Sequence, residues 1–311
     1  MKVHYDIQTL PAFRNAVITI GTFDGLHNGH RKIIDLMLQE ADSVKGETVI
    51  ITFDPHPRQV VGKENNPVFL LNTLDEKIFL LQNSGIDHLV VIPFTEAFSS
   101  QTAESYIRDF LVNTFKPHTI IIGYDHHFGK DRSGNYKLLE AKAEEYNFVV
   151  KEIPVYMLKD VTISSTKIRE AILHGDIDTA RNFLGYDYFF TGKVIAGNKL
   201  GRTIGYPTAN IQIEDNQKLI PGNGVYAVLI KINSLKIKDY SGMMNIGIRP
   251  TINGVMRVIE VNIFDFDEDI YGAMITVTLK KHLRSEIKFN GLDALKEQLA
   301  IDKGEAVRAL S

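Results

Sequence analysis

The sequence predicts two domains of different class, an α/β domain with a parallel sheet and then an antiparallel β-domain, on three observations. The chain has 311 residues, enough for two domains of ordinary size. Before residue 185, apolar runs alternate with segments of helical periodicity. After residue 185, short alternating segments separated by Gly, Pro and Asn predict a barrel or sandwich with one terminal helix. We therefore expect domains at residues 1–184 and 185–311.

The expected parallel sheet consists of apolar, β-branched segments, which is the composition of strands buried on both faces. These strands are 16–20, 47–53, 87–92, 118–122 and 148–153. Helical spacing and capping residues predict helices over 31–38, 75–83, 102–115, 135–146, 166–173 and 176–184. Ligands of such sheets bind at the carboxyl ends of the strands, where polar segments are found in this sequence. These segments are 22–30, 54–58 and 123–135.

The strand-to-helix turn Gly21–His30, GTFDGLHNGH, is the first candidate site. Its glycines let the backbone approach a ligand closely, and the free N–H groups of the next helix favour an anion there. If the helix starts near Asn28, His27 and His30 gather at its N-terminus, where imidazole donors suit a phosphate that gains negative charge. A solvated turn with two surface histidines and a zinc pair are the alternatives, although no Cys is present and no third ligand is indicated.

Two further loops follow strand ends. In Asp54–Arg58, DPHPR, two prolines stiffen the backbone and are expected to hold His56 and Arg58 outward. The loop Gly123–Gly134, GYDHHFGKDRSG, combines charges, histidines and glycines, so it is either a ligand clamp or a mobile surface loop.

The segment Ser164–Arg169, SSTKIR, opens the helix expected at 166–173. Ser164 and Ser165 are natural N-caps, and capping alone would explain them. The segment also places hydroxyl groups and cations at a helix N-terminus, which suits a triphosphate.

The second half contains expected strands at 189–195, 225–232, 258–264 and 274–279, and a helix at 292–300. The stretch Gly192–Asn210 is rich in glycine but lacks the P-loop pattern, so a glycine-rich hairpin is the simple alternative to a nucleotide loop. It leads into Thr208 and Asn210, which are two apart on an expected strand and so share one face. Their oxygen atoms are donors that Mg²⁺ accepts beside ATP oxygens.

Composition narrows the class of protein. Apolar residues make up 44% and charged residues 23%, with a net charge of −3, so we expect no nucleic-acid surface. The absence of Cys excludes disulfides and thiol catalysis. Neither a signal peptide nor a membrane span is indicated, so we expect a cytoplasmic protein that does not engage a membrane. The oligomeric state stays open, and oligomerisation is compatible with the sequence.

The motifs of the first half carry a family resemblance. GTFDGLHNGH resembles the HxGH signature of nucleotidylyltransferases and, as GxFDGxHxGH, the bacterial bifunctional riboflavin kinase/FAD synthetase family. Ile163–Arg169 is similar to the ISSTxxR landmark, and the loop 123–134 is similar to GxDFxFGxxRxG, with His126 where the family usually has Phe. The resemblance implies a Rossmann-like nucleotidylyltransferase domain with His27, His30 and Arg169 as catalytic residues. It implies ATP contacts from Gly21, Phe23, Asp24, Gly29, Asp125, Ser165 and Thr166, and flavin contacts from Asp54, His56, Pro57 and Arg58.

The second half resembles riboflavin kinases through GRxxGYPTAN, NIGIRPTING and VIEVNIFDFDEDIYG. The resemblance implies a barrel in which Glu260 is the general base, although a strand Glu could equally face solvent. It implies ATP contacts from Gly192, Gly197, Gly201, Arg202, Thr208 and Asn210, of which Thr208 and Asn210 also hold Mg²⁺. Arg284, Glu286 and Phe289 match an RxExxF segment that lies near the flavin.

Together these resemblances imply a bifunctional enzyme that phosphorylates riboflavin to FMN and adenylylates FMN to FAD. ATP is then a co-substrate, Mg²⁺ a cofactor, and FMN and FAD are substrate and product. Two rivals remain at this point. One is another adenylyl- or cytidylyltransferase, such as one acting on pantetheine phosphate, and the other is a non-catalytic flavin sensor on the same scaffold.

Overall fold

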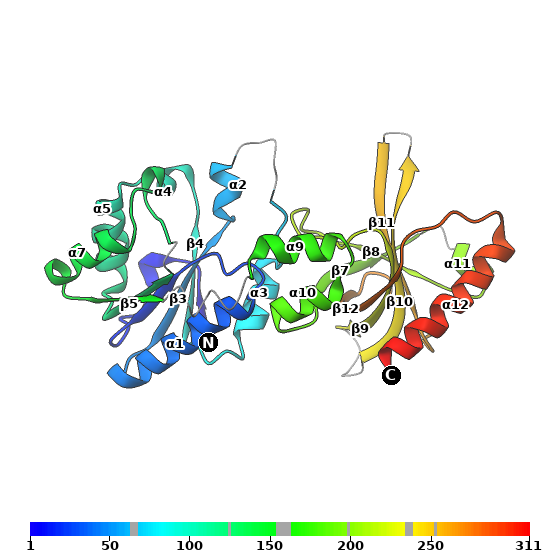
Figure 1. Ribbon diagram of the computed structural model, residues 1–311, viewed down its shortest axis with the longest axis horizontal. Coiled ribbons are helices and arrows are strands. Elements are labelled where there is room, and N and C mark those ends of the chain that lie inside the picture. The colour runs from blue at the N-terminus through cyan, green and yellow to red at the C-terminus, as the bar shows by residue number, and fades with distance from the viewer. Residues whose placement is uncertain (63–67, 124–125, 154–162, 198–199, 234–238, 252–253) are drawn as a thin grey trace. The chain divides into compact units, whose positions relative to one another are not determined.

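The computed structural model describes all residues except 63–67, 124–125, 154–162, 198–199, 234–238 and 252–253 (Figure 1). The chain divides into two compact units, Met1–Ser164 and Ser165–Ser311. Each unit is built around its own sheet, as the sequence predicts. Among the described residues, no helix combines the length and the apolar character needed to cross a membrane.

The first unit is an α/β layer structure around a six-stranded parallel sheet of order β1-β4-β3-β2-β5-β6. The strands are β1 (Lys2–His4), β2 (Val17–Ile20), β3 (Thr48–Asp54), β4 (His88–Pro93), β5 (Thr119–Gly123) and β6 (Val149–Ile153). The chain runs outward from β2 to β4 and then returns to the other side of β2. The strand order therefore reverses at β2 and β5, the place where open parallel sheets bind ligands.

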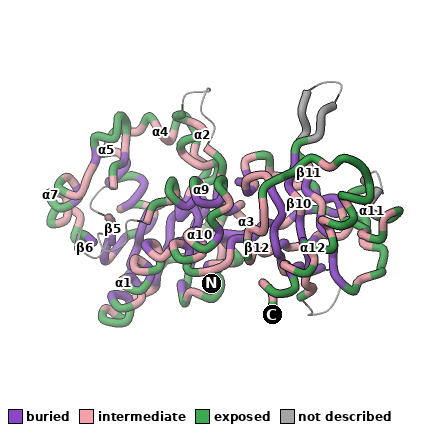
Figure 2. The backbone as a smooth tube through the Cα atoms, turned by 45° about the vertical axis from the view of Figure 1, so that its right-hand side comes forward, coloured by how far each residue is buried: buried purple, intermediate pink, exposed green. Residues whose placement is uncertain are grey.

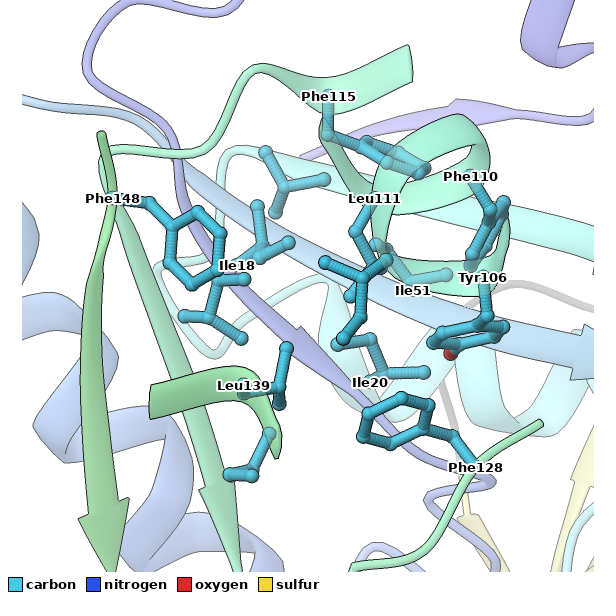
Figure 3. Packing of buried hydrophobic residues seen from close by; sticks show 14 of the residues in the cluster. Ile18, Ile20, Ile51, Tyr106, Phe110, Leu111, Phe115, Phe128, Leu139 and Phe148 are labelled. Carbon is cyan, nitrogen blue, oxygen red and sulfur yellow. The ribbon is translucent and has the colours of Figure 1, made fainter. Parts of the chain in front are cut away.

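Helices cover both faces of this sheet. They are α1 (Asn28–Val44), α2 (Pro57–Val61), α3 (Leu74–Leu81), α4 (Glu96–Ser99), α5 (Ala103–Ser105), the π-helical segment Tyr106–Val112, α6 (Asn113–Phe115) and α7 (Tyr136–Tyr146), with short 3₁₀ turns at Ile7–Thr9 and Lys130–Arg132. Alternate strand residues separate the two cores: Val17 packs with α1 and α3, whereas Ile18 packs with the aromatic cluster of residues 103–115 (Figure 3). Along α1, buried and exposed residues alternate as expected for a helix that covers a sheet (Figure 2).

The second unit is a closed antiparallel barrel of order β10-β11-β8-β7-β12-β9, which decides between the barrel and the sandwich that the sequence left open. Its strands are β7 (Phe189–Ile195), β8 (Ala209–Gln212), β9 (Gly224–Ile232), β10 (Asp239–Thr251), β11 (Gly254–Ile263) and β12 (Met274–Arg284). Its helices are α9 (Ser165–Leu173), α10 (Ile177–Leu184), the short α11 (Leu200–Thr203) and the terminal α12 (Leu292–Leu310). Helix α12 packs on the outer side of the barrel, where Ala306 lies in one cluster with Ala227 and Met243.

Two strands were not predicted. β1 is only three residues long, so it carries too little alternation to be recognised. β10 is long, but Gly242 and Gly247 interrupt its apolar pattern. A Cβ at Gly242 would lie 2.6 Å from the Asn262 carbonyl oxygen, so close packing of the strands explains that glycine.

Two candidate active sites

The turn between β2 and α1 brings His27 and His30 into direct contact. α1 begins at Asn28, as expected, and His27 is its N-cap residue. The two imidazole rings stack with centroids 3.8 Å apart and an interplanar angle of 16°. A Cβ at Gly29 would lie 3.1 Å from the His27 ring, so the glycine between the histidines leaves room for the stack. The sequence HNGH thus folds into a histidine pair at a helix N-terminus.

Burial determines the charge of this pair. Desolvation lowers the pKa of His27 to about 4, although the Asp24 carboxylate opposes the shift. Burial, together with the positive charges of His27 and Lys77, lowers the pKa of His30 well below its ordinary value. Both imidazoles are therefore neutral at pH 7 in the ligand-free protein and donate hydrogen bonds rather than charge. Their Nδ1 atoms are buried and have no hydrogen-bond partner among the described residues, as expected where a ligand completes the site.

The rest of the turn is fixed by packing and by a buried carboxylate. Phe23 is buried in the core under α1 with a φ of 48°, a strained backbone of the kind that clusters at functional sites. Asp24 is 3% exposed and accepts a hydrogen bond of 2.9 Å from the backbone N–H of Leu71. Gly21 donates its N–H to the Ile51 carbonyl oxygen of β3. These contacts fix the turn, and the ATP contacts expected of Gly21, Phe23, Asp24 and Gly29 stay predictions.

Lys77 is a site residue that the sequence reasoning missed. Its side chain is buried below the turn, with 7% of the residue exposed, and Nζ donates a 3.2 Å hydrogen bond to Oγ1 of Thr52. The sequence did contain a signal, because Lys77 lies between Leu74 and Leu81 at the spacing of the apolar face of α3. A lysine in such a position must find a polar environment inside the protein.

The segment after β3 differs in part from expectation. His56 does not simply point outward: it caps α2, its Nδ1 accepting from the Arg58 N–H at 3.1 Å. Pro57 is the first residue of that helix, a position that suits proline. Arg58 is exposed, so its side chain lies at the surface as expected, and Asp54 is exposed as well. The flavin contacts of these four residues stay predictions.

The described part of the loop 123–134 is anchored in the core. Phe128 is 5% exposed and stacks on Tyr106 with centroids 4.9 Å apart. A Cβ at Gly134 would lie 2.3 Å from the Phe128 ring, so packing explains that glycine. His126 lies 6.0 Å from the same ring. Asp125, the expected nucleotide contact, lies outside the described residues.

Ser165, Thr166 and Arg169 are on α9, which starts at Ser165, one residue earlier than predicted. α9 belongs to the second compact unit, whereas the sequence predicts it within the first domain. The roles expected of Ser165, Thr166 and Arg169 in ATP binding and catalysis stay predictions.

The second candidate site is a polar row across three barrel strands. Asn245 of β10 pairs directly with Glu260 of β11, and Glu260 pairs with Asn210 of β8. Directly opposed residues share one face of a sheet. The neighbours Met244 and Val261 are fully buried in the barrel, so the alternation of β-strands turns this row to the outer face. Glu260 therefore has a carboxamide on each side instead of the isolated position that a surface glutamate would have.

The glycine stretch closes over one end of this row. A Cβ at Gly197 would lie 2.0 Å from Nδ2 of Asn210, and one at Gly201 would lie 3.5 Å from Oγ1 of Thr208. Gly197 thus brings the backbone directly against Asn210, whereas the tightest neighbour of Gly201 is the Tyr206 carbonyl oxygen, at 2.2 Å from such a Cβ. Thr208 precedes β8 instead of lying within it, which corrects the expectation that both residues belong to one strand.

Two other residues that are predicted to contact ATP lie on β7 and α11. Gly192 lies within β7, where a Cβ would be 2.5 Å from Cγ2 of Ile211, so strand packing is sufficient reason for the glycine. Arg202 is exposed on α11. Their contacts with ATP stay predictions.

The segment after β12 approaches the row from the other end. The Glu286 carboxylate accepts a 3.2 Å hydrogen bond from Asn223, and a Cβ at Gly247 would lie 2.1 Å from its Oε1. Arg284 donates two hydrogen bonds, of 2.8 and 2.7 Å, to the buried Asp302 carboxylate of α12, and its guanidinium lies 5.8 Å from the Phe289 ring. Arg284 therefore holds the terminal helix, and its predicted flavin contact is untested.

Within the described part of the chain, no three His, Cys, Asp or Glu side chains form a group that could hold a metal ion. Thr208 and Asn210 contribute neutral oxygen atoms, and the glycine stretch brings its backbone against them. This donor set fits a Mg²⁺ ion that is largely coordinated by ATP phosphates and water.

Comparison with known proteins matches both halves of the chain to known families. The family model described as FAD synthetase matches residues 10–167, and that described as riboflavin kinase matches residues 184–310. A bifunctional riboflavin kinase/FMN adenylyltransferase of Haemophilus influenzae is 39% identical over 93% of this chain and 92% of its own length. One of the same name from Bacillus subtilis is 38% identical over 95% and 93%.

A solved structure from Streptococcus pneumoniae, described as a macrolide-efflux protein, is 29% identical to this chain with a TM-score of 0.83. The match covers 97% of both chains. Its description as an efflux protein concerns that protein, and the similarity of the fold extends over nearly all of both chains.

Proposed function

Because the chain belongs to the family of bifunctional riboflavin kinase/FMN adenylyltransferases, we propose that its two reactions take place in two separate sites. The enzyme phosphorylates riboflavin to FMN with ATP, and it adenylylates FMN with ATP to give FAD and pyrophosphate. One site surrounds the stacked His27 and His30, and the other surrounds the polar row with Glu260. The observation that carries this proposal is that the histidine pair lies in the matched FAD synthetase segment and the row in the matched riboflavin kinase segment.

In the adenylyl-transfer site, a phosphate oxygen of FMN attacks the α-phosphorus of ATP while the bond to the β-phosphate oxygen breaks and pyrophosphate leaves. No covalent enzyme intermediate is needed. The neutral imidazoles of His27 and His30 donate N–H groups to oxygens that gain negative charge. The burial of the pair supports the hydrogen-bond donation by imidazoles that the sequence predicts.

In the kinase site, Glu260 takes the proton from the ribityl 5′-hydroxyl as that oxygen bonds to the γ-phosphorus and ADP leaves. The flanking carboxamides of Asn210 and Asn245 restrict the position of the carboxylate. Thr208 and Asn210 would hold Mg²⁺, which supplies positive charge beside the phosphates of ATP when bound. Gly197 and Gly201 let the backbone approach the nucleotide.

We further propose that the functional domains meet at residues 184 and 185 and that the enzyme works in the cytoplasm on small-molecule substrates. The boundary is supported by the riboflavin kinase match, which begins at residue 184.

The test is incubation with riboflavin, Mg²⁺ and ATP, with FMN and FAD separated by chromatography. Both products are expected, with FMN formed first. FMN without FAD would leave only the kinase, and neither product would favour a flavin sensor. A parallel incubation with pantetheine phosphate tests the rival activity, which is adenylyl transfer to that substrate.

A further inference from the structure

Lys77 is a buried cation beside the histidine pair with no role in the proposed chemistry. It lies on α3, whose apolar face covers the sheet, and 7% of its surface is exposed. A lysine ammonium is almost never buried unless it is paired or hydrogen-bonded, because desolvation of the charge is costly. The contacts of the Lys77 ammonium group therefore indicate the function of this buried charge.

These contacts join three segments of the site. Nζ of Lys77 donates to Oγ1 of Thr52 on β3 at 3.2 Å. The same hydroxyl donates to the carbonyl oxygen of Thr22, in the turn after β2, at 3.2 Å. The Thr52 hydroxyl thus links the lysine to the backbone of the turn that leads to His27 and His30.

Two carboxylates act on the buried ammonium group of Lys77. Burial lowers the pKa of Lys77, and the carboxylates of Asp24 in the turn and Asp54 at the end of β3 oppose this shift. The Asp24 carboxylate also accepts the N–H of Leu71, just before α3. The groups that act on His30 are then Lys77 and His27, both of which disfavour its protonation.

We propose that Lys77 is a positioning residue for adenylyl transfer, whose buried ammonium group orients the Thr52 hydroxyl that bonds the histidine-bearing turn to β3. The proposal rests on the function proposed above for His27 and His30. Without Lys77, the Thr52 hydroxyl loses its hydrogen bond to α3 and can turn away from the Thr22 carbonyl oxygen. The histidine pair then loses support for its orientation, together with a positive charge that adds to burial in disfavouring protonation of His30. Misplacement of catalytic groups by about 1 Å costs about a hundredfold in rate.

The experiment compares full-length Lys77→Met, Thr52→Val and His30→Ala with the parent enzyme. FAD formation from supplied FMN is measured, with FMN formation from riboflavin as the folding control in the same chain. The His30 resonance is followed in ¹³C-histidine NMR from pH 7 to pH 4. Lys218→Met is the matched control. Lys218 is another buried lysine, 2% exposed, and it lies in the other unit, where its Nζ donates a hydrogen bond of 2.9 Å to the Phe189 carbonyl oxygen.

We expect Lys77→Met to lower kcat for FAD formation about a hundredfold, to leave FMN formation within a factor of two, and to let His30 protonate at higher pH. Thr52→Val breaks the link but keeps the charge, so it should lower kcat for FAD formation about tenfold without moving the His30 titration. Lys218→Met should leave FAD formation unchanged.

Full FAD formation by Lys77→Met, or a loss without any change in the His30 titration, would overturn the positioning role. If Lys77→Met does not fold, unchanged FAD formation by Thr52→Val overturns it instead. Unchanged FAD formation by His30→Ala would instead contradict the proposed function, because the histidine pair would then not be the adenylyl-transfer site.

Discussion

Glu260 lies on β11 between the carboxamides of Asn210 and Asn245, and its side chain can accept a proton only while it is a carboxylate. Glu260→Gln keeps the shape of the row and removes the base. FMN formation from riboflavin should fall by about a hundredfold or more, while FAD formation from supplied FMN stays at the parent rate. Initial rates of both reactions by chromatography check this. Equal loss of both products would contradict separate sites, and Glu268→Gln, at an exposed position, is the control.

His30 provides the reciprocal case. Removal of its imidazole by His30→Ala takes one donor and half of the stack from the adenylyl-transfer site. FAD formation should fall about a hundredfold, and FMN formation should persist. The exposed His174 serves as control in His174→Ala. An unchanged yield of FAD would remove His30 from its role.

Buried neutral histidine also makes stability depend on pH. His27 has a pKa of about 4 in the folded protein, against the ordinary histidine value of 6.5 that we take for the unfolded chain. Between these values the unfolded chain binds the proton and the folded chain does not, so stability falls as the pH drops below 6.5. From pH 7 to pH 5 this single group accounts for about 2 kcal/mol. Urea unfolding at both pH values should show a correspondingly smaller loss for His27→Asn, and an identical loss in both proteins would show that His27 is not buried neutral.

At the scale of elements, the ion pair between Arg284 of β12 and Asp302 of α12 fixes the terminal helix on the barrel. The Asp302 side chain is 1% exposed and that of Arg284 is 20% exposed. Asp302→Asn keeps the volume but leaves the guanidinium without its carboxylate, so the barrel should lose about 3 kcal/mol of unfolding free energy. Differential scanning calorimetry measures this. Arg108→Gln breaks the exposed pair with Asp109 and should leave the melting temperature nearly unchanged, because solvent screens that pair.

Element prediction succeeded where a pattern is long and repeated. The segment 189–195 matches β7 at both ends, and α10 ends at Leu184 with Gly185 in the left-handed conformation expected of a C-cap. It failed for β10, because two glycines interrupt the apolar pattern of that strand, and Gly242 is required by close packing against β9 and β11. A local sequence pattern cannot predict this requirement, because the neighbouring residues are distant in the sequence.

At the scale of the whole molecule, the sequence and the contacts place the domain boundary at different residues. The two boundaries predict different stabilities for fragments of the chain. The sequence places the boundary at residue 185, whereas contacts group α9 and α10 with the barrel. Arg181 of α10 donates to Asp187 and to the carbonyl oxygen of Lys280, and the Gly222 N–H donates to the carbonyl oxygen of Ile172 at 3.2 Å. These contacts belong to one unit, so loss of α9 and α10 exposes apolar surface of the barrel.

We therefore expect a fragment of residues 165–311 to fold and to make FMN but no FAD. A fragment of residues 185–311 should unfold at a lower temperature, by several degrees. Thermal unfolding followed by circular dichroism compares the two. Equal melting temperatures would show that the contacts of α9 and α10 add nothing to the stability of the barrel.

The sequence by itself determined the fold class of both halves, the histidine pair at a helix N-terminus, and the order of the motifs. Each of these follows from local spacing, since periodicity, capping and glycine positions act over a few residues. Only the tertiary structure decided the charge of His27 and His30, the burial of Lys77, the asparagines beside Glu260 and the ion pair of Arg284. These depend on residues that are far apart in the chain and meet through sheet register and burial, which no local pattern encodes.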